Sequence, residues 1–353
     1  MKYTMHAIQS LSPLAWHLAQ AACSHVRMNA LTGDTLAVIL SFLCPEELLL
    51  CVRGVCRTFR TQVTTNPAAW PTHFDMPMGL RNLHGTVPRR MQCTSLRCTS
   101  DARLGQYLGW FRNLRKLVVG YGIDDRKIQF IVRMCPLLED AEFRGTRMSQ
   151  DGFAKLSALP LTRLAIGFNE LDVVGPPTPI RSMPLMKNLD MGILSVGSTE
   201  FIRECTNVRS LSLLPDDPRY VDRIKDRLLS LEHLDVSDRS AELLLRVGVF
   251  PCLKSLVLRS TLSHPACIGR HAGLRFLNVC VLGEEVPTAE LGSMLRNLAC
   301  LEELRVSSIS RRSHMKAIAR SVTPTLRRIY VCPEECGERS DEFLEELLPR
   351  CWN

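Results

Sequence analysis

The stretch Leu231-Glu-His-Leu-Asp-Val236 is followed by Leu253-Lys-Ser-Leu-Val-Leu258 and then by Leu274-Arg-Phe-Leu-Asn-Val279. Each stretch has apolar residues at its first, fourth and sixth positions, with variable residues between them. The three stretches begin 22 and 21 residues apart. Self-similarity at a period of roughly 20 to 50 residues indicates a repeat array. Internal repetition therefore decides the fold.

The same apolar triplet occurs ten times between residues 114 and 331. Its first positions are 24, 23, 25, 22, 23, 22, 21, 27 and 25 residues apart. This spacing is typical of leucine-rich repeats, which recur every roughly 20 to 29 residues. The triplets are Leu114-Leu117-Val119, Leu138-Ala141-Phe143, Leu161-Leu164-Ile166, Met186-Leu189-Met191, Val208-Leu211-Leu213, Leu231-Leu234-Val236, Leu253-Leu256-Leu258, Leu274-Leu277-Val279, Leu301-Leu304-Val306 and Leu326-Ile329-Val331.

Each triplet predicts a short strand whose apolar side chains one repeat cannot bury alone. Stacked repeats form a parallel sheet on the concave side, over a continuous core. Most segments between triplets have apolar residues at helical spacing and predict amphipathic returning helices. We expect Ser149 and Thr199 to cap two of these helices. Their apolar positions are Ile128, Ile131, Val132 and Cys135; Phe201, Ile202 and Cys205; Leu291, Met294, Leu295 and Leu298; and Met315, Ile318, Ala319 and Val322.

Two segments depart from this scheme. Between Asn169 and Met186 the chain has four prolines, which forbid a regular helix, so we expect an extended return segment. Residues 333–353 are acidic and have a helical pattern, with Ser340 preceding two carboxylates that suit a helix N-terminus. We expect this last segment to be the polar cap that ends the array.

The 15 cysteines are odd in number and are spread singly through apolar sequence. No secretory signal is recognisable before them, so we expect reduced thiols in the cytoplasm, with the nucleus as a second location. Cys135 and Cys205 each stand three residues before a triplet, as in the cysteine-containing variety of the repeat. We expect these two thiols to fill the core. No apolar run reaches the roughly 18 residues of a membrane span.

A different pattern lies between Leu31 and Trp70. It predicts three short helices, of which the second begins at Pro45, before two glutamates, and the third runs from Val55 to Val63. About forty residues make a very small core. The apolar surface left over predicts that a partner covers this module.

This run resembles an F-box, through Leu31-Thr-Gly-Asp, Ile39-Leu-Ser-Phe-Leu43, Pro45-Glu-Glu-Leu48, Val55-Cys-Arg-Thr-Phe59 and Trp70. In that family the three-helix module docks on a Skp-type adaptor, which links it to a cullin–RING ubiquitin ligase. The repeats behind the F-box bind the substrate. The resemblance implies adaptor contacts through Leu31, Thr32, Ile39, Leu40, Leu43, Pro45, Glu46, Leu48, Val52, Val55, Phe59 and Trp70.

Two alternatives remain open. One is that residues 31–70 form an N-terminal helical cap for the array, since every repeat array needs capping. The other is a stand-alone interaction scaffold that takes no part in ubiquitination. Thr32 favours the scaffold, because the F-box family usually has proline there, in the adaptor contact.

The side chains between the buried leucines point away from the core and line the concave face. Their charges are mixed in sign, whereas a nucleic-acid backbone requires a continuous positive track. The sequence also has no phosphate-binding glycine loop and no His-Glu-x-x-His motif. We therefore expect a protein partner, and neither catalysis, metal nor cofactor. The residues expected to bind substrate are Asp140, Glu142, Arg144, Asp190, His233, Asp235, Arg259, Phe276, Arg305 and Tyr330.

These patterns predict an N-terminal extension over residues 1–27, an F-box over 28–75, a linker over 76–90 and a solenoid with its cap over 91–353. The extension has only two strong bases, which suits an extra helix or loose tail better than a mitochondrial presequence. The expected function is non-catalytic substrate recognition in a ubiquitin ligase, with no nucleic acid and no membrane as partners. Binding would raise the effective concentration of a substrate lysine near the carrier of ubiquitin.

Overall fold

The computed structural model describes residues 72–76, 93–98, 104, 108–169, 178–192, 196–214, 222–237, 244–246, 250–309, 311–321 and 323–331. The predicted N-terminal extension, the F-box as far as residue 71, the linker after residue 76 and the C-terminal cap lie outside these ranges. The chain divides into two compact units. Unit 1 comprises residues 1–147 with 158–161, and unit 2 comprises residues 148–157 with 162–353.

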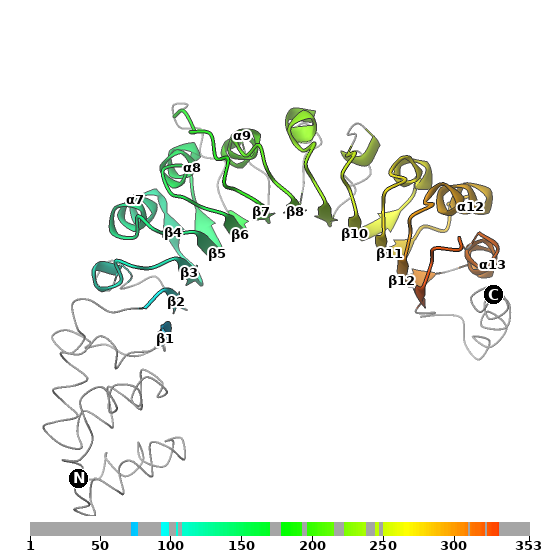
Figure 1. The fold of residues 1–353 in the computed structure, drawn as a ribbon, viewed down its shortest axis with the longest axis horizontal. Coiled ribbons are helices and arrows are strands. Elements are labelled where there is room, and N and C mark those ends of the chain that lie inside the picture. Colours follow the sequence, from blue (N-terminus) through cyan, green and yellow to red (C-terminus); the bar gives the residue numbers. More distant parts are fainter. Residues whose placement is uncertain are drawn as a thin grey trace, which may run out of the picture. The chain divides into compact units, whose positions relative to one another are not determined.

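Unit 1 contains a parallel sheet in which β1, β2, β3 and β5 pair in chain order. The two-residue strand β4 also pairs with β5. The helix α7 returns the chain between β4 and β5 (Figure 1). The elements are β1 (His73–Met76), β2 (Ser95–Cys98), the 3-10 helix η4 (Leu108–Trp110), β3 (Lys116–Val119), β4 (Ile123–Asp124), α7 (Asp125–Met134) and β5 (Asp140–Arg147).

Unit 2 contains a longer parallel sheet, in which β6 to β13 pair in chain order. The returning helices lie together on the side away from the strand row (Figure 1). The elements are α8 (Gln150–Leu156), β6 (Arg163–Asn169), β7 (Asn188–Met191), α9 (Val196–Glu204), β8 (Ser210–Leu213), η5 (Lys225–Arg227), β9 (His233–Val236), β10 (Ser255–Leu262), η6 (Pro265–Arg270), β11 (Phe276–Leu282), α12 (Thr288–Asn297), β12 (Glu303–Ile309), α13 (Arg312–Arg320) and β13 (Arg328–Val331).

The ten apolar triplets coincide with β3 and with β5 to β13. Equivalent triplet residues are paired in the sheet, as Leu234, Leu256 and Leu277 are, and all three are at most 1% exposed. Side chains alternate between the two sides of a strand, so within each unit the apolar residues of neighbouring repeats meet in a shared core. This repetition of sequence, strand and core confirms a leucine-rich-repeat solenoid.

The sheet of unit 1 begins earlier than the triplets predict. Strand β2 has the same pattern, with Cys93, Leu96 and Cys98 in the triplet positions, and all three are at most 2% exposed. Counting cysteine as an apolar residue would have revealed this repeat in the sequence. Strand β1 precedes it and pairs with it in parallel.

The predicted returning helices are present at α7, α9, α12 and α13. Ser149 caps α8, since its side chain accepts a hydrogen bond from the backbone N–H of Asp151. The prediction for Thr199 is wrong. Helix α9 begins at Val196, so Thr199 lies within the helix and is fully buried.

The proline-containing return segment follows the prediction in its described part, residues 178–187, which contains no helix. Its backbone packs against neighbouring repeats of unit 2 through side-chain hydrogen bonds. The Gln150 amide donates to the Thr178 carbonyl at 3.3 Å, and the Ser157 hydroxyl accepts from the Arg181 N–H at 3.0 Å. These bonds replace the ones that a helix would make internally.

The predicted core cysteines are buried. Cys135 and Cys205 are both 0% exposed, and the Cys205 thiol donates to the Phe201 carbonyl at 3.2 Å. Burial raises the pKa of Cys135 to about 12 and, with the charge of Glu204, raises that of Cys205 as well. These thiols therefore pack as apolar groups. Among the described residues, no helix is long and apolar enough to span a lipid bilayer.

Candidate protein-binding face

The strand face of unit 2 is built from two rows of side chains on the side of the sheet opposite the core. Strands in a sheet lie about 4.8 Å apart, so the eight strands β6 to β13 present a face about 34 Å long. The first row is Arg163, Asn188, Ser210, His233, Ser255, Phe276, Glu303 and Arg328. The second row is Ala165, Asp190, Ser212, Asp235, Val257, Asn278, Arg305 and Tyr330.

Seven of the ten predicted substrate-binding residues lie on or beside this face. Asp190, Asp235, Arg305 and Tyr330 belong to the second row, His233 and Phe276 belong to the first, and Arg259 follows the triplet of β10. The register of the sheet thus confirms their common placement. Their role in binding stays a prediction.

The other three predicted residues lie in unit 1. Asp140 forms an ion pair with Lys116 across the β3–β5 pairing, with 3.0 Å between Oδ2 and Nζ. Glu142 forms an ion pair with Arg144 within β5, with 3.0 Å between Oε1 and Nε. Both acids are therefore occupied by cations of their own unit.

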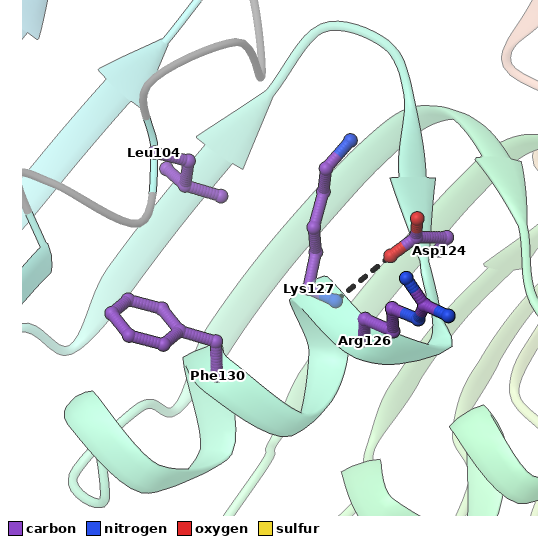
Figure 2. Close-up of a pocket in the computed structure, with 5 residues that line it drawn as sticks. All are labelled: Leu104, Asp124, Arg126, Lys127 and Phe130. Atoms are coloured by element: carbon purple, nitrogen blue, oxygen red, sulfur yellow. Dashed lines mark hydrogen bonds between the residues drawn. The ribbon is translucent and has the colours of Figure 1, made fainter.

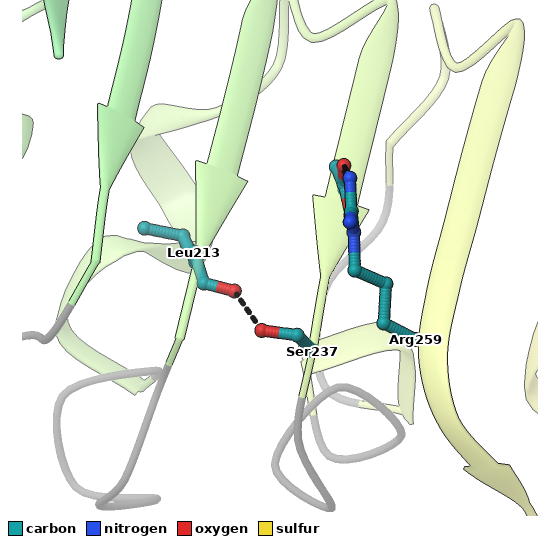
Figure 3. A network of polar contacts seen from close by, with 4 residues as sticks. Leu213, Ser237 and Arg259 are labelled. Atoms are coloured by element: carbon teal, nitrogen blue, oxygen red, sulfur yellow. Dashed lines mark hydrogen bonds and ion pairs between the residues drawn. The ribbon is translucent and has the colours of Figure 1, made fainter. Parts of the chain in front are cut away.

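In the middle of the strand face, Arg259 binds Asp235 through both carboxylate oxygens. Nε donates to Oδ1 at 2.9 Å, and Nη2 donates to Oδ2 at 2.7 Å. The hydrogen bonds and charge of Asp235 raise the pKa of Arg259 above its ordinary value. Figure 3 shows Arg259 and also Ser237, whose hydroxyl donates to the Leu213 carbonyl at 3.5 Å. Asp235 therefore pairs with arginine.

At the C-terminal end of the face, Arg305 lies between two aromatic rings. Its guanidinium carbon is 5.4 Å from the ring centroid of Phe276 and 5.0 Å from that of Tyr330. Below it, Glu303 is only 6% exposed and pairs with Arg305 and with Arg328. Glu303 is not among the predicted residues, although its place in the first row follows from the repeat.

A second line of charges runs where the strands begin. Lys254 donates to Glu232 at 2.6 Å, and Arg209 lies 3.6 Å from the same carboxylate. These contacts lower the pKa of Glu232. Arg275 and Glu302 repeat the arrangement at 3.6 Å. Each of these two acids is therefore paired with a basic residue of a neighbouring repeat.

The helix side of unit 1 has a pocket of about 230 Å³, lined by Leu104, Asp124, Arg126, Lys127 and Phe130 (Figure 2). Asp124 caps α7 by accepting a hydrogen bond from the Lys127 N–H at 2.8 Å. Its carboxylate therefore serves the helix terminus. Within the described ranges, no group of three His, Cys, Asp or Glu side chains is placed to hold a metal ion.

No protein-family model matches the chain, and no curated protein matches it. The solved structures that this chain resembles include three that are named here. The leucine-rich-repeat protein LegL7 of Legionella pneumophila is 14% identical with a TM-score of 0.45, over 79% of this chain and 98% of LegL7. TLR13, in complex with ssRNA13, is 16% identical with a TM-score of 0.43, over 70% of this chain and 36% of TLR13.

The third similar structure is an internalin, InlF of Listeria monocytogenes. It is 12% identical with a TM-score of 0.34, over 67% of this chain and 79% of the internalin. The repeat register and the buried core of this chain carry the fold assignment by themselves.

Proposed function

We propose that this chain is the non-catalytic substrate-recognition subunit of a Skp–cullin–F-box ubiquitin ligase. The strand face supports a role in binding, because one continuous row of repeats presents arginine, acidic and aromatic side chains along about 34 Å. Aromatic residues and arginine are enriched at the centres of protein interfaces. The ligase assignment rests on the F-box resemblance of residues 31–70.

In this proposal the two parts have separate tasks. Leu40, Pro45 and the other predicted adaptor residues bury against a Skp-type adaptor. The strand face holds a folded protein or a peptide segment of it. Transfer of ubiquitin is then accelerated by proximity, because a held lysine has a high effective concentration near the charged carrier. The chain itself supplies no reacting group.

Co-purification with a Skp-type adaptor and a cullin tests the proposal. The wild-type chain is expected to recover both, and the Leu40→Ala, Pro45→Ala double variant is expected to lose them. The double variant Pro184→Ala, Leu185→Ala is a matched control, because it changes the same residue types at exposed positions of the solenoid. It should recover the adaptor like the wild type.

The second candidate function is a stand-alone interaction scaffold, which Thr32 favours. If the wild type recovers no adaptor while remaining folded, the ligase role is rejected and the scaffold is supported. If adaptor recovery is equal in all three chains, residues 31–70 do not form the adaptor contact.

A further inference from the structure

Two arginines share one carboxylate at the C-terminal end of the strand face. Arg305 donates to Glu303 Oε1 from Nε at 2.7 Å and approaches it with Nη2 at 2.6 Å. Arg328 Nη1 lies 3.2 Å from the other oxygen, Oε2. Glu303 is buried, whereas the side chains of Arg305 and Arg328 are 48% and 62% exposed. The cluster therefore carries one positive charge in excess.

The pair formed by Arg259 and Asp235 provides the contrast. There, one guanidinium meets one carboxylate through both oxygens, and the charges balance. In the Glu303 cluster, both carboxylate oxygens are already used. The described residues provide no acceptor for Nη1 of Arg305, or for Nε and Nη2 of Arg328. These N–H groups can donate to a ligand.

The aromatic rings fix the position of Arg305. With Phe276 on one side and Tyr330 on the other, the planar guanidinium is held in place before any partner arrives. Such preorganisation lowers the entropy lost on binding. Tyr330 is 51% exposed, so its ring also offers apolar area beside the charge. Arginine and tyrosine are the residue types that most often dominate binding energy at interfaces.

We propose that Phe276, Glu303, Arg305, Arg328 and Tyr330 form the docking point for an Asp or Glu side chain of a partner protein. An apolar neighbour of that acid covers the ring of Tyr330. The geometry of a guanidinium matches a carboxylate through two parallel hydrogen bonds. One excess positive charge suits a carboxylate better than a phosphate, which carries nearly two negative charges. This inference rests on the proposed function, since it names the chemistry of the partner held by the strand face.

The test uses the full chain and a fluorescein-labelled peptide in which Gly-Glu-Val is repeated four times. Fluorescence anisotropy measures its affinity against that of a peptide with Gln in place of Glu. The Glu peptide is expected to bind at least tenfold more tightly. The Glu303→Gln variant should bind it several-fold more tightly than the wild type, because the internal carboxylate no longer competes.

The triple variant Glu303→Gln, Arg305→Gln, Arg328→Gln removes the cluster and leaves no unpaired buried acid. It should bind the Glu peptide at least tenfold more weakly than the wild type. Arg320→Gln is the control, because it changes the net charge by the same single unit at an exposed position of α13, on the side of the sheet away from the strand face. Its affinity should stay within about twofold of the wild type, since a distant surface charge acts weakly at physiological salt.

Three results would overturn the docking point: equal affinity of the triple variant and the wild type, an equal loss in Arg320→Gln, or weaker binding by Glu303→Gln. Circular dichroism establishes that each variant is folded. If the triple variant is unfolded, Tyr330→Ala decides instead, because it removes exposed ring area and leaves the ion pairs intact. It should weaken binding at least threefold, and unchanged binding would reject the proposal.

The ligase role and the docking point can fail separately. Adaptor recovery depends on residues 31–70, so the triple variant should recover the adaptor like the wild type. Adaptor recovery without peptide binding rejects the docking point alone. Peptide binding without adaptor recovery rejects the ligase role, while the docking point for an acidic side chain of a partner is still supported.

Discussion

Arg259 reaches from β10 to Asp235 on β9 and binds both oxygens of its carboxylate, at 2.9 Å and 2.7 Å. The two side chains are 62% and 27% exposed. Water and salt therefore screen much of their attraction. The pair sets the charge pattern of the strand face and contributes little to its stability.

We expect Arg259→Gln to lower the free energy of unfolding by less than about 1 kcal/mol, as is typical of exposed ion pairs. Urea denaturation at low and at high salt measures the effect. The difference from the wild type should shrink at high salt. A loss well above this size that salt does not change would mean that the pair is structurally essential.

Breaking the ion pair between Arg305 and Glu303 should lower the free energy of unfolding more than Arg259→Gln does. The Glu303 carboxylate is buried, so Arg305→Gln leaves it with only Arg328 as a partner. We expect a loss of about 1–2 kcal/mol, because an incompletely paired buried charge is costly. Adding Glu303→Gln to the same chain should restore most of that loss. If the double variant is less stable than Arg305→Gln, the buried charge is not the cause.

Gly192 allows a packing test. A Cβ added there would collide with the carbonyl oxygen of Gly167 on the neighbouring strand. Because that contact is with backbone, Gly192→Ala must distort the β6–β7 pairing, at a cost of about 3 kcal/mol. Gly273→Ala is the control, since its Cβ meets nothing closer than 3.8 Å and should change stability by less than about 0.5 kcal/mol. Similar thermal midpoints for the two variants would contradict this prediction.

The buried His271 should make the folded chain less stable in mild acid. It is 6% exposed and stacks on Phe250, and burial lowers its pKa below the ordinary value of 6.5. Above pH 6.5 the imidazole is neutral in both the folded and the unfolded chain. As the pH falls below that value, the unfolded chain takes up a proton before the folded chain does, so folding becomes less favourable.

Urea denaturation between about pH 7.5 and about pH 5 compares the wild type with His271→Gln, which cannot titrate there. The stability of the wild type relative to the variant should decrease as the pH falls. A relative stability that is flat, or that rises in acid, would contradict a lowered pKa. Other titrating groups are common to both chains and cancel in the comparison.

Exposed cysteines of the native chain should be alkylated before buried ones. Cys252 and Cys300 are exposed, whereas Cys135 and Cys205 are fully buried, and the Cys135 pKa is raised to about 12. Since the thiolate is the reactive form, iodoacetamide should modify the exposed pair first in the native chain. Peptide mass spectrometry then finds Cys135 and Cys205 modified only after denaturant is added. Equal labelling of all four in the native chain would show that the core opens readily.

The sequence predicted the solenoid well because one strand cannot bury its own apolar residues, and the chain therefore repeats them. The triplet of Leu253, Leu256 and Leu258 defines both a strand and its register with its neighbours. The start of α9 was missed, because Thr199 resembles a cap although earlier residues join the helix. Caps are local features, and a few residues of extra helix override them.

The position of the strand face was predicted from the sequence, but its ion pairs were not. The repeat places Asp235, Arg305 and Tyr330 in one row, and the structure bears this out. The sequence does not tell which cation meets which acid, since side chains such as Arg259 reach across to another strand. Glu303 was missed because an acid between two leucines reads as exposed until its arginine neighbours are known.

The parallel register also means that one whole repeat could be removed without disturbing the pairing of the others. In unit 2, β11 pairs only with β10 and β12, and residues 274–300 span one complete repeat of 27 residues. Deleting them would bring β10 against β12 with their triplets in phase, and the face would become shorter by about 4.8 Å. Insertion or loss of whole repeats can thus change which partners fit without requiring a new fold. Such a chain can evolve its specificity by changing length as well as by substitution.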